Sequence, residues 1–208
     1  MSIEKDWSAV AEDFDKRQEY VIGDKTETVI EDHLASLSNL GKTIEFGCGN
    51  GKYTKYILAE TDHMTATDVS PDMLEVVKNK FKGTNKVTFE LADCYAANYE
   101  RSSYDTVFMA NLIHVVLEPA RALKEAERLL RKGGRLILVS FTSDGMSTEN
   151  LAGLKARYQE VFGAFPENKV PMCLQDLTKL VRACRFKIEH ASLIGAGTKA
   201  MFVVASRI

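Results

Sequence analysis

The sequence predicts an α/β domain built on a doubly wound, mostly parallel sheet with helices on both faces. Segments of helical and of strand periodicity alternate from about Asp24 to the end of the chain, which is typical of strand–helix–strand units. Three consecutive strand segments end in glycines or in an acidic residue, as expected where such sheets bind ligands. The 208 residues suit one domain, so we expect residues 1–208 to fold as a single unit.

The composition argues against a dedicated nucleic-acid-binding protein. The chain carries 27 basic and 29 acidic side chains, whereas a nucleic-acid-binding domain is usually basic. The N-terminal residues lack the apolar core of a secretory signal, and the longest nearly apolar stretch, 107–117, is too short to span a bilayer. The four cysteines form no C-x-x-C pair, which favours reduced thiols and no metal site. We therefore expect a cytoplasmic protein without membrane contact.

Two helical patterns open the chain. Apolar residues at the spacing of one helix face predict a helix within residues 1–22. These residues are Trp7, Val10, Ala11 and Phe14. A second helix is predicted to end near Asn39–Gly41, where asparagine and glycine are typical stop signals. Its apolar face is formed by Val29, Ile30, His33, Leu34 and Leu37.

Five short apolar segments then alternate with helices and are predicted to be strands. The strands are Thr43–Phe46, Met64–Thr67, Val87–Leu91, Asp105–Ala110 and Arg135–Phe141. The helices between them cover Lys52–Glu60, the residues from Pro71 onward, and Pro119–Arg131. Ser70 suits the N-cap of the helix at Pro71, because proline tolerates the first helical position. Gly133–Gly134 is predicted to end the last of these helices.

The final third of the chain predicts two more helices and two strands. Apolar spacing marks helices over about 151–162 and 174–181, separated by a proline-containing loop at Phe165–Met172. The closing strands are Phe186–Ser192 and Lys199–Ser206. The few residues between them favour an antiparallel hairpin, because a parallel pair would need a dozen or more linking residues.

The strongest local signal is the segment Glu45–Gly51, whose glycines are spaced G-x-G-x-G between a strand and a helix. Glycine lets a ligand approach main-chain amides, and the following helix points free N–H groups at the same place, so the loop suits a carboxylate or a phosphate. The spacing differs from the dinucleotide fingerprint, because Lys52 stands where its third glycine would be, and also from the phosphate-binding P-loop. Taken alone, such a loop also fits a strand-to-helix turn without a ligand.

Two acids follow the next two strands. Asp68 lies 21 residues after Gly47, at a distance where an acid can accept hydrogen bonds from both hydroxyls of a ribose. Asp93 follows the third strand, where its carboxylate could accept from an exocyclic amine such as adenine N6. Each acid by itself also fits an ordinary helix start or loop. The series along one edge of the sheet favours a nucleoside ligand.

With these residues the sequence resembles the class I S-adenosylmethionine-dependent methyltransferases from about Asp24 to Ile208. It looks closest to the methyltransferase type 11 and ubiquinone/menaquinone-biosynthesis-like group. The segments that carry the resemblance are Glu45–Gly51, Asp68–Leu74, Leu91–Cys94, Tyr104–Ala110 and Leu130–Leu136. The resemblance implies a Rossmann-like sheet of seven strands in the order 3-2-1-4-5-7-6, with strand 7 antiparallel. It also implies S-adenosylmethionine as the cofactor and S-adenosylhomocysteine as its product.

The resemblance implies a role for each matching residue on the methionine and ribose side. The residues that would line the methionine end and sugar of the cofactor are Gly47, Cys48, Gly49 and Gly51. Glu45 would orient that loop and reach the methionine amino group through water, and Asp68 would bind the ribose hydroxyls. Asn111, after the fourth strand, would face the methionine portion and the substrate.

The resemblance likewise implies an adenine site. Val69 and Met73 would flank the adenine ring, and Asp93 would bind its N6 with the Cys94 backbone nearby.

Methyl transfer from a sulfonium is an in-line displacement that depends on alignment and on exclusion of water, and it needs a base only when the nucleophile is protonated. His114 is the histidine placed near the expected site and is a candidate general base, with a packing role at the start of a helix as the alternative. The N-P-P-Y or D-P-P-Y motif of methyltransferases that act on base amino groups is absent, which favours a small-molecule acceptor. The alternatives are a methyltransferase of protein or RNA, and a cofactor-binding protein without turnover.

Two segments are expected to build the acceptor site. In relatives the N-terminal stretch folds over the cofactor, so residues 1–22 are expected to form a lid. Tyr20, within this lid, is expected to close on the site. Residues 143–172 are expected to cover the substrate, with Tyr158 and Phe162 toward it, although aromatic residues at helical spacing also suit an ordinary core. We expect a monomer or a homodimer.

Overall fold

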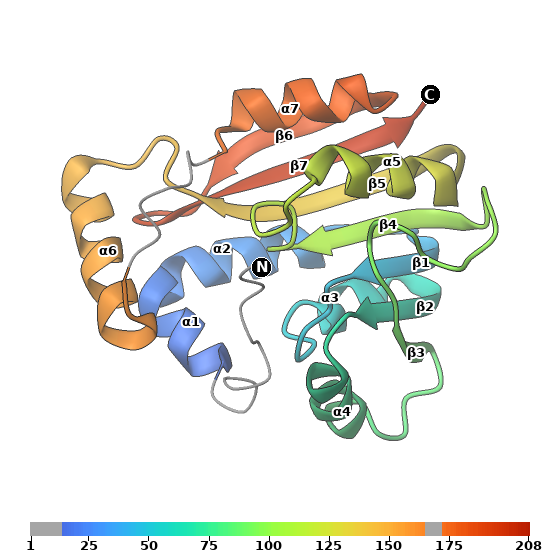
Figure 1. Cartoon of the computed structure of the whole chain (residues 1–208), viewed down its shortest axis with the longest axis horizontal. Coiled ribbons are helices and arrows are strands. Elements are labelled where there is room, and N and C mark those ends of the chain that lie inside the picture. Colours follow the sequence, from blue (N-terminus) through green and yellow to red (C-terminus); the bar gives the residue numbers. More distant parts are fainter. Residues whose placement is uncertain (1–13, 165–171) are drawn as a thin grey trace.

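The computed structural model describes residues 14–164 and 172–208, which contain a seven-stranded sheet as the middle layer (Figure 1). The strand order is β3-β2-β1-β4-β5-β7-β6. The strands are β1 (Gly41–Phe46), β2 (Thr61–Asp68), β3 (Val87–Leu91), β4 (Tyr104–Ala110), β5 (Leu130–Thr142), β6 (Phe186–Ile194) and β7 (Lys199–Arg207). β7 runs antiparallel to β5 and β6, and the other neighbouring strands are parallel. The predicted strand order, the antiparallel seventh strand and the closing hairpin are confirmed.

Helices cover both faces of the sheet (Figure 1). They are α1 (Phe14–Ile22), α2 (Asp24–Ala35), α3 (Thr54–Ala59), α4 (Pro71–Lys80), α5 (Pro119–Leu129), α6 (Thr148–Phe162) and α7 (Leu174–Ala183). Side chains of α2, α3 and α4 form the core on one face, and side chains of α5 and α7 form the core on the other. Successive residues of a strand point to opposite faces, so Phe108 packs in the first core while Val107 and Met109 pack in the second.

The start of α4 has the predicted cap. Ser70 has an extended backbone, its Oγ accepts the N–H of Met73 at 3.3 Å, and Pro71 occupies the first helical position. This cap fixes the direction in which the chain leaves β2, directly after Asp68.

The junction of α5 and β5 differs from the prediction. The predicted helix end at Arg131 and strand start at Arg135 are wrong, because α5 ends at Leu129 and β5 begins at Leu130. Leu130 is extended, with φ −69° and ψ 141°, and it pairs with Tyr104 of β4. The strand therefore passes through Gly133 and Gly134. Tyr104 pairs with Leu130 and Thr106 pairs with Arg135, so the extra residues of β5 lie at a register shift between these two pairs.

The second helix also ends earlier than predicted, at Ala35 instead of near Asn39–Gly41. Leu40 is fully buried, and its N–H donates to the carbonyl of Glu60 at 2.9 Å. That contact draws the chain out of the helix and into β1.

Two predicted segments fall on residues that the structure does not describe. They are the helix residues Trp7, Val10 and Ala11 of the expected lid, and residues 165–171 of the expected substrate cover.

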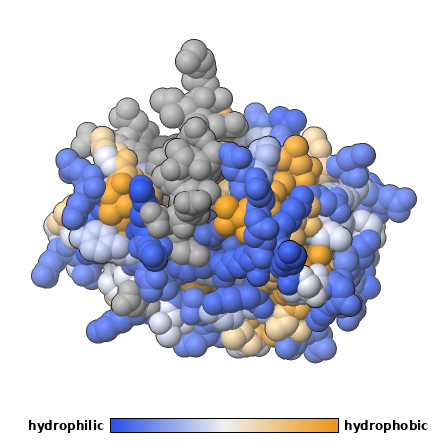
Figure 2. Space-filling model, turned by 90° about the horizontal axis from the view of Figure 1, so that it is seen from below, coloured by the Kyte–Doolittle hydropathy of each residue, from blue (hydrophilic) through white to orange (hydrophobic). Residues whose placement is uncertain are grey.

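Within the described residues, no helix is long and apolar enough to cross a membrane. The face shown in Figure 2 is mostly hydrophilic, and its hydrophobic residues lie in small separate groups.

Glu45 of β1 is a buried acidic residue. The side chain is 2% exposed, and its Oε2 accepts the hydroxyl of Thr54 at 2.7 Å, which joins β1 to the first residue of α3. Burial raises the pKa of Glu45 from the ordinary 4.5 to about 8, against the lowering effect of the Thr54 hydrogen bond.

The pKa of Glu45 predicts that the protein loses stability as the pH rises from about 4.5 to about 8. In that range the folded state keeps a proton on Glu45 that the unfolded chain has lost, so raising the pH favours unfolding, by up to about 1.4 kcal/mol per pH unit. We expect Glu45→Gln to remove this component. Urea unfolding of both proteins at several pH values measures it, with Glu60→Gln at an exposed position as the control. Parallel pH profiles for wild type and Glu45→Gln would contradict this assignment.

Candidate active site

The carboxyl ends of β1, β2, β3 and β4 bring the predicted cofactor residues together at one edge of the sheet. β1 and β4 are parallel neighbours, and the chain leaves β1 for α3 on one face and β4 for α5 on the other. Such a reversal of direction is where open α/β sheets bind ligands. The loops after adjacent strands touch, because a Cβ at Gly47 would lie 3.0 Å from Cδ1 of Leu112.

The glycine loop is shaped by backbone conformations that suit glycine. Gly47, Gly49 and Gly51 all have positive φ, at 69°, 52° and 78°. At Gly51 an added Cβ would lie 2.6 Å from Val77, so α4 packs directly on this residue. At Gly49 nothing lies within 4 Å of that position, so this side of the loop is open to a ligand. Cys48, between Gly47 and Gly49, is buried, and its N–H donates to the carbonyl of Thr67 at 2.9 Å.

Asp68 connects the glycine loop to the end of β2. Its Oδ2 accepts the N–H of Gly49 at 2.8 Å, and its Oδ1 accepts the N–H of Ser70 at 2.9 Å. Burial raises the pKa of Asp68, and these two amides act in the opposite direction. The carboxylate thus helps to set the shape of the loop in which the ligand was predicted to sit.

The two residues predicted to flank adenine differ in exposure. Val69 is 60% exposed directly after Asp68, which is unusual for valine and leaves an apolar surface at the site. Met73 is buried in the first turn of α4.

Asp93 and Cys94 form a turn after β3. This turn adjoins β2, because the N–H of Ala92 donates to the carbonyl of Asp68 at 3.1 Å. Asp93 is exposed, and its Oδ1 accepts the N–H of Tyr95 at 2.8 Å, whereas Cys94 is packed in the core.

Asn111 follows β4 in a left-handed conformation with φ 54°. Its N–H donates to the carbonyl of Val139 at 2.7 Å, and its Oδ1 accepts the N–H of Phe141 at 3.3 Å. The Nδ2 of the same side chain is buried and is among the few buried side-chain atoms of the described residues that have no hydrogen-bond partner.

His114 is paired with a residue that the sequence reasoning missed. Its Nδ1 lies 2.8 Å from the hydroxyl of Ser140, which is fully buried in β5. A serine within the otherwise apolar run Leu136–Phe141 was the signal that could have identified it. The contact fixes the orientation of the imidazole ring.

The aromatic residues of the predicted acceptor site lie where α1 meets α6 (Figure 1). The hydroxyl of Tyr20 donates to Glu160 at 2.8 Å, and the rings of Tyr158 and Phe162 lie 5.2 Å apart. Tyr158 and Phe162 pack against the small core that contains Val21. Their contact with a substrate stays a prediction.

Glu27 is a second residue that sequence reasoning missed. This buried acid of α2 accepts the hydroxyl of Tyr53 at 2.7 Å and the amide of Gln18 at 3.1 Å, and it pairs with Lys52 at 3.0 Å. Burial and Glu27 raise the pKa of Tyr53, which keeps its hydroxyl a donor. The helical phase that places Glu27 with the buried Ile30 and Leu34 was the available signal.

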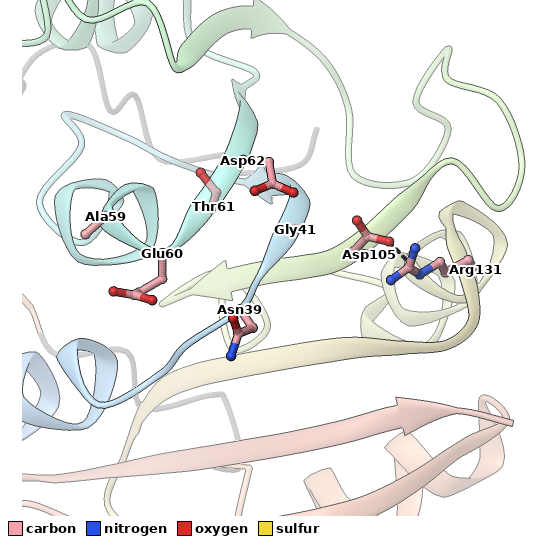
Figure 3. A pocket seen from close by; sticks show the side chains of 8 residues that line it. All are labelled: Asn39, Gly41, Ala59, Glu60, Thr61, Asp62, Asp105 and Arg131. Carbon is pink, nitrogen blue, oxygen red and sulfur yellow. Dashed lines mark ion pairs between the residues drawn. The ribbon is translucent and has the colours of Figure 1, made fainter.

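A polar hollow lies at the opposite edge of the sheet, at the amino ends of β1, β2 and β4 (Figure 3). Its lining residues are Asn39, Gly41, Ala59, Glu60, Thr61, Asp62, Asp105 and Arg131. Asp105 and Arg131 form an ion pair on one side of it. The hollow contains none of the residues predicted to bind the cofactor.

Part of the chain is similar to known methyltransferases. A family model described as a methyltransferase domain matches residues 44–138, from β1 into β5. The demethylmenaquinone methyltransferase of Clavibacter sepedonicus is 29% identical over 49% of this chain and 42% of its own length. The malonyl-[acyl-carrier protein] O-methyltransferase of a Paenibacillus species is 26% identical over 71% of this chain and 54% of its own length. The matched part of the chain thus spans about half the length of these relatives.

Solved structures share the whole fold. The crystal structure of a SAM-dependent methyltransferase from Aquifex aeolicus superposes with a TM-score of 0.72 at 16% identity, over 97% of this chain and 98% of that one. The matched segment contains the glycine loop, Asp68, Asp93, Asn111 and His114. Residues 44–138 thus match a methyltransferase domain, and the sheet order and overall fold are similar to those of solved S-adenosylmethionine-dependent methyltransferases.

Proposed function

We propose that this protein binds S-adenosylmethionine at the carboxyl edge of the sheet and transfers its methyl group to a small molecule. The observation that carries the proposal is the joined series of features after β1, β2, β3 and β4, in which Asp68 links the glycine loop to the nucleoside side. This arrangement suits one extended ligand with a charged amino-acid end and an adenosine end.

The amino-acid end fits the residues around Asn111. The Nδ2 of Asn111 is buried without a hydrogen-bond partner of good geometry, although it acts on the Tyr53 hydroxyl, and the methionine carboxylate would supply it with an acceptor. The open side of Gly49 allows a ligand to reach the backbone of the loop. Glu45, at the start of the loop, would interact with the methionine amino group through water.

The adenosine end fits Asp68 and the residues after it. Each oxygen of the Asp68 carboxylate accepts one backbone amide, and a carboxylate has about four acceptor positions, so capacity remains for the ribose hydroxyls. The exposed Val69 and the neighbouring Met73 would flank the adenine ring, and the exposed Asp93 would accept from its amino group.

The charges of the site suit a cationic cofactor. Asp68 and Asp93 are the acids among the proposed binding residues, whereas the raised pKa of Glu45, about 8, keeps that side chain protonated and uncharged at neutral pH. When bound, S-adenosylmethionine supplies a methyl group on a positively charged sulfonium, and transfer of that group removes the charge. The protein contributes alignment of the two reactants and exclusion of water.

Two observations support a small-molecule acceptor. The acidic and basic side chains nearly balance, at 29 and 27, which does not suit a phosphate backbone. One relative is named for demethylmenaquinone, a small molecule. His114 is the proposed general base, and the contact of its Nδ1 with the Ser140 hydroxyl orients the imidazole ring. Tyr20, Tyr158 and Phe162 are proposed to contribute apolar surface to the acceptor side.

The proposal predicts transfer of radiolabel from S-adenosylmethionine to a small acceptor. The assay compares phenols, quinols, thiols, amines and carboxylic acids with total RNA and with protein. We expect label in one class of small molecule. Label in RNA or protein alone would contradict the small-molecule acceptor, and cofactor binding with no transfer to any acceptor would favour a binding protein without turnover.

A role of His114 as general base predicts that His114→Asn lowers kcat by about 100-fold or more, because positioned bases contribute about 10²–10⁴-fold. Binding of S-adenosylhomocysteine should stay within about twofold of wild type, by the same reasoning. Ser140→Ala should give a smaller loss of kcat, since the base remains but its ring is less well oriented. The matched control is His63→Asn, in β2 near its amino end. Equal kcat values for the His114 and His63 variants would contradict a role of His114 as general base.

A further inference from the structure

We propose that Glu125 and Arg128 of α5 make the site selective for adenine, by positioning the turn that carries Asp93. Neither residue is part of the glycine loop or of the acids that follow the strands. The inference rests on the proposed function, because it takes Asp93 as the group that accepts from the adenine amino group.

The turn at Asp93 is shaped locally but needs an external anchor. The Asp93 carboxylate accepts the N–H of Tyr95 at 2.8 Å, and the Asp93 carbonyl accepts the N–H of Ala96 at 3.3 Å. These bonds lie within the turn, so they do not fix its position relative to the sheet. The Asp93 side chain is exposed and gains no packing of its own. Ala92 ties the start of the turn to Asp68, and Cys94 and Tyr95 pack on the core, so the anchor still needed is on the residues that leave the turn.

Glu125 and Arg128 supply the anchor on the following residues. The N–H of Ala97 donates to Oε1 of Glu125 at 2.8 Å. The Arg128 guanidinium donates to the carbonyl of Ala97 through Nη2 and to the carbonyl of Tyr99 through Nη1, both at 2.8 Å. Three backbone groups after Asp93 are therefore held by two side chains of one helix.

The two anchoring side chains also fix each other. Nε and Nη2 of Arg128 donate to the two oxygens of Glu125, each at 2.8 Å, which is a bidentate pair. Glu125 is 8% exposed, so water competes little for its oxygens. Bidentate, charge-assisted pairs are geometrically specific as well as strong. The Glu125–Arg128 pair therefore connects α5 to the turn of Asp93 in a fixed geometry.

Position matters here because a hydrogen bond from an amine to a carboxylate needs a distance of about 2.7–3.2 Å. A turn displaced by about 1 Å would lose that bond while the rest of the ligand stayed in place. Loss of the Glu125–Arg128 pair is thus expected to weaken the hydrogen bond to the adenine amino group. It should affect binding of the remainder of the cofactor much less.

The test compares two ligands by isothermal titration, S-adenosylhomocysteine and its analogue with purine in place of adenine. Wild type should prefer the adenine ligand by about tenfold or more, the effect of one hydrogen bond to a charged group. Glu125→Gln should reduce this preference to about twofold, with the purine analogue bound as in wild type. Arg128→Lys keeps the positive charge but loses the bidentate hydrogen bonds to Glu125. It should also reduce the preference for the adenine ligand.

Glu127→Gln is the matched control, because Glu127 lies on the same helix and pairs with Arg207 at 2.8 Å without touching the turn. It should keep the full preference even if the protein is less stable. Equal weakening of both ligands in Glu125→Gln and Arg128→Lys would show a merely structural role and overturn the inference. The same holds if wild type binds both ligands equally. Wild type that binds neither ligand would instead contradict the proposed function itself.

Discussion

Parallel pairing of β3, β2, β1 and β4 is the constraint from which the candidate site follows. Strands that run in the same direction leave the sheet at the same edge, so residues as distant in sequence as Gly47 and Asn111 become neighbours. Hydrogen bonds then join the separate loops, from Gly49 to the Asp68 carboxylate and from Ala92 to the Asp68 carbonyl. Asp68 therefore belongs to the fold and to the site at once.

The glycine loop is held from several sides, which leaves one side for a ligand. The residues that follow the loop are held by two buried acids, Glu45 through Thr54 and Glu27 of α2 through Lys52 and Tyr53. The Gln18 amide brings α1 to the same Glu27.

Local sequence signals were sufficient to locate each strand of the described sheet, although not every strand boundary. The apolar runs gave Val87–Leu91 with its bounds, and the Ser70-Pro71 pair gave the cap of α4. The end of α5 was not predictable in this way, because Leu130 leaves the helix to pair with Tyr104, a contact between segments distant in sequence. The residues that support the site were missed for the same reason: Ser140, Glu27 and Glu125 act through partners that only the folded chain brings near.

The central claim is that the carboxyl edge binds S-adenosylmethionine through Asp68 and the glycine loop. Isothermal titration of the protein with S-adenosylhomocysteine tests it most directly, beside NAD, Asp68→Ala, and Asp62→Ala at the amino end of β2 as the matched control. We expect binding of S-adenosylhomocysteine to wild type and to Asp62→Ala, a large loss in Asp68→Ala, and no binding of NAD. Failure of the folded wild-type protein to bind S-adenosylhomocysteine, or equal binding by the Asp68 variant, would contradict it.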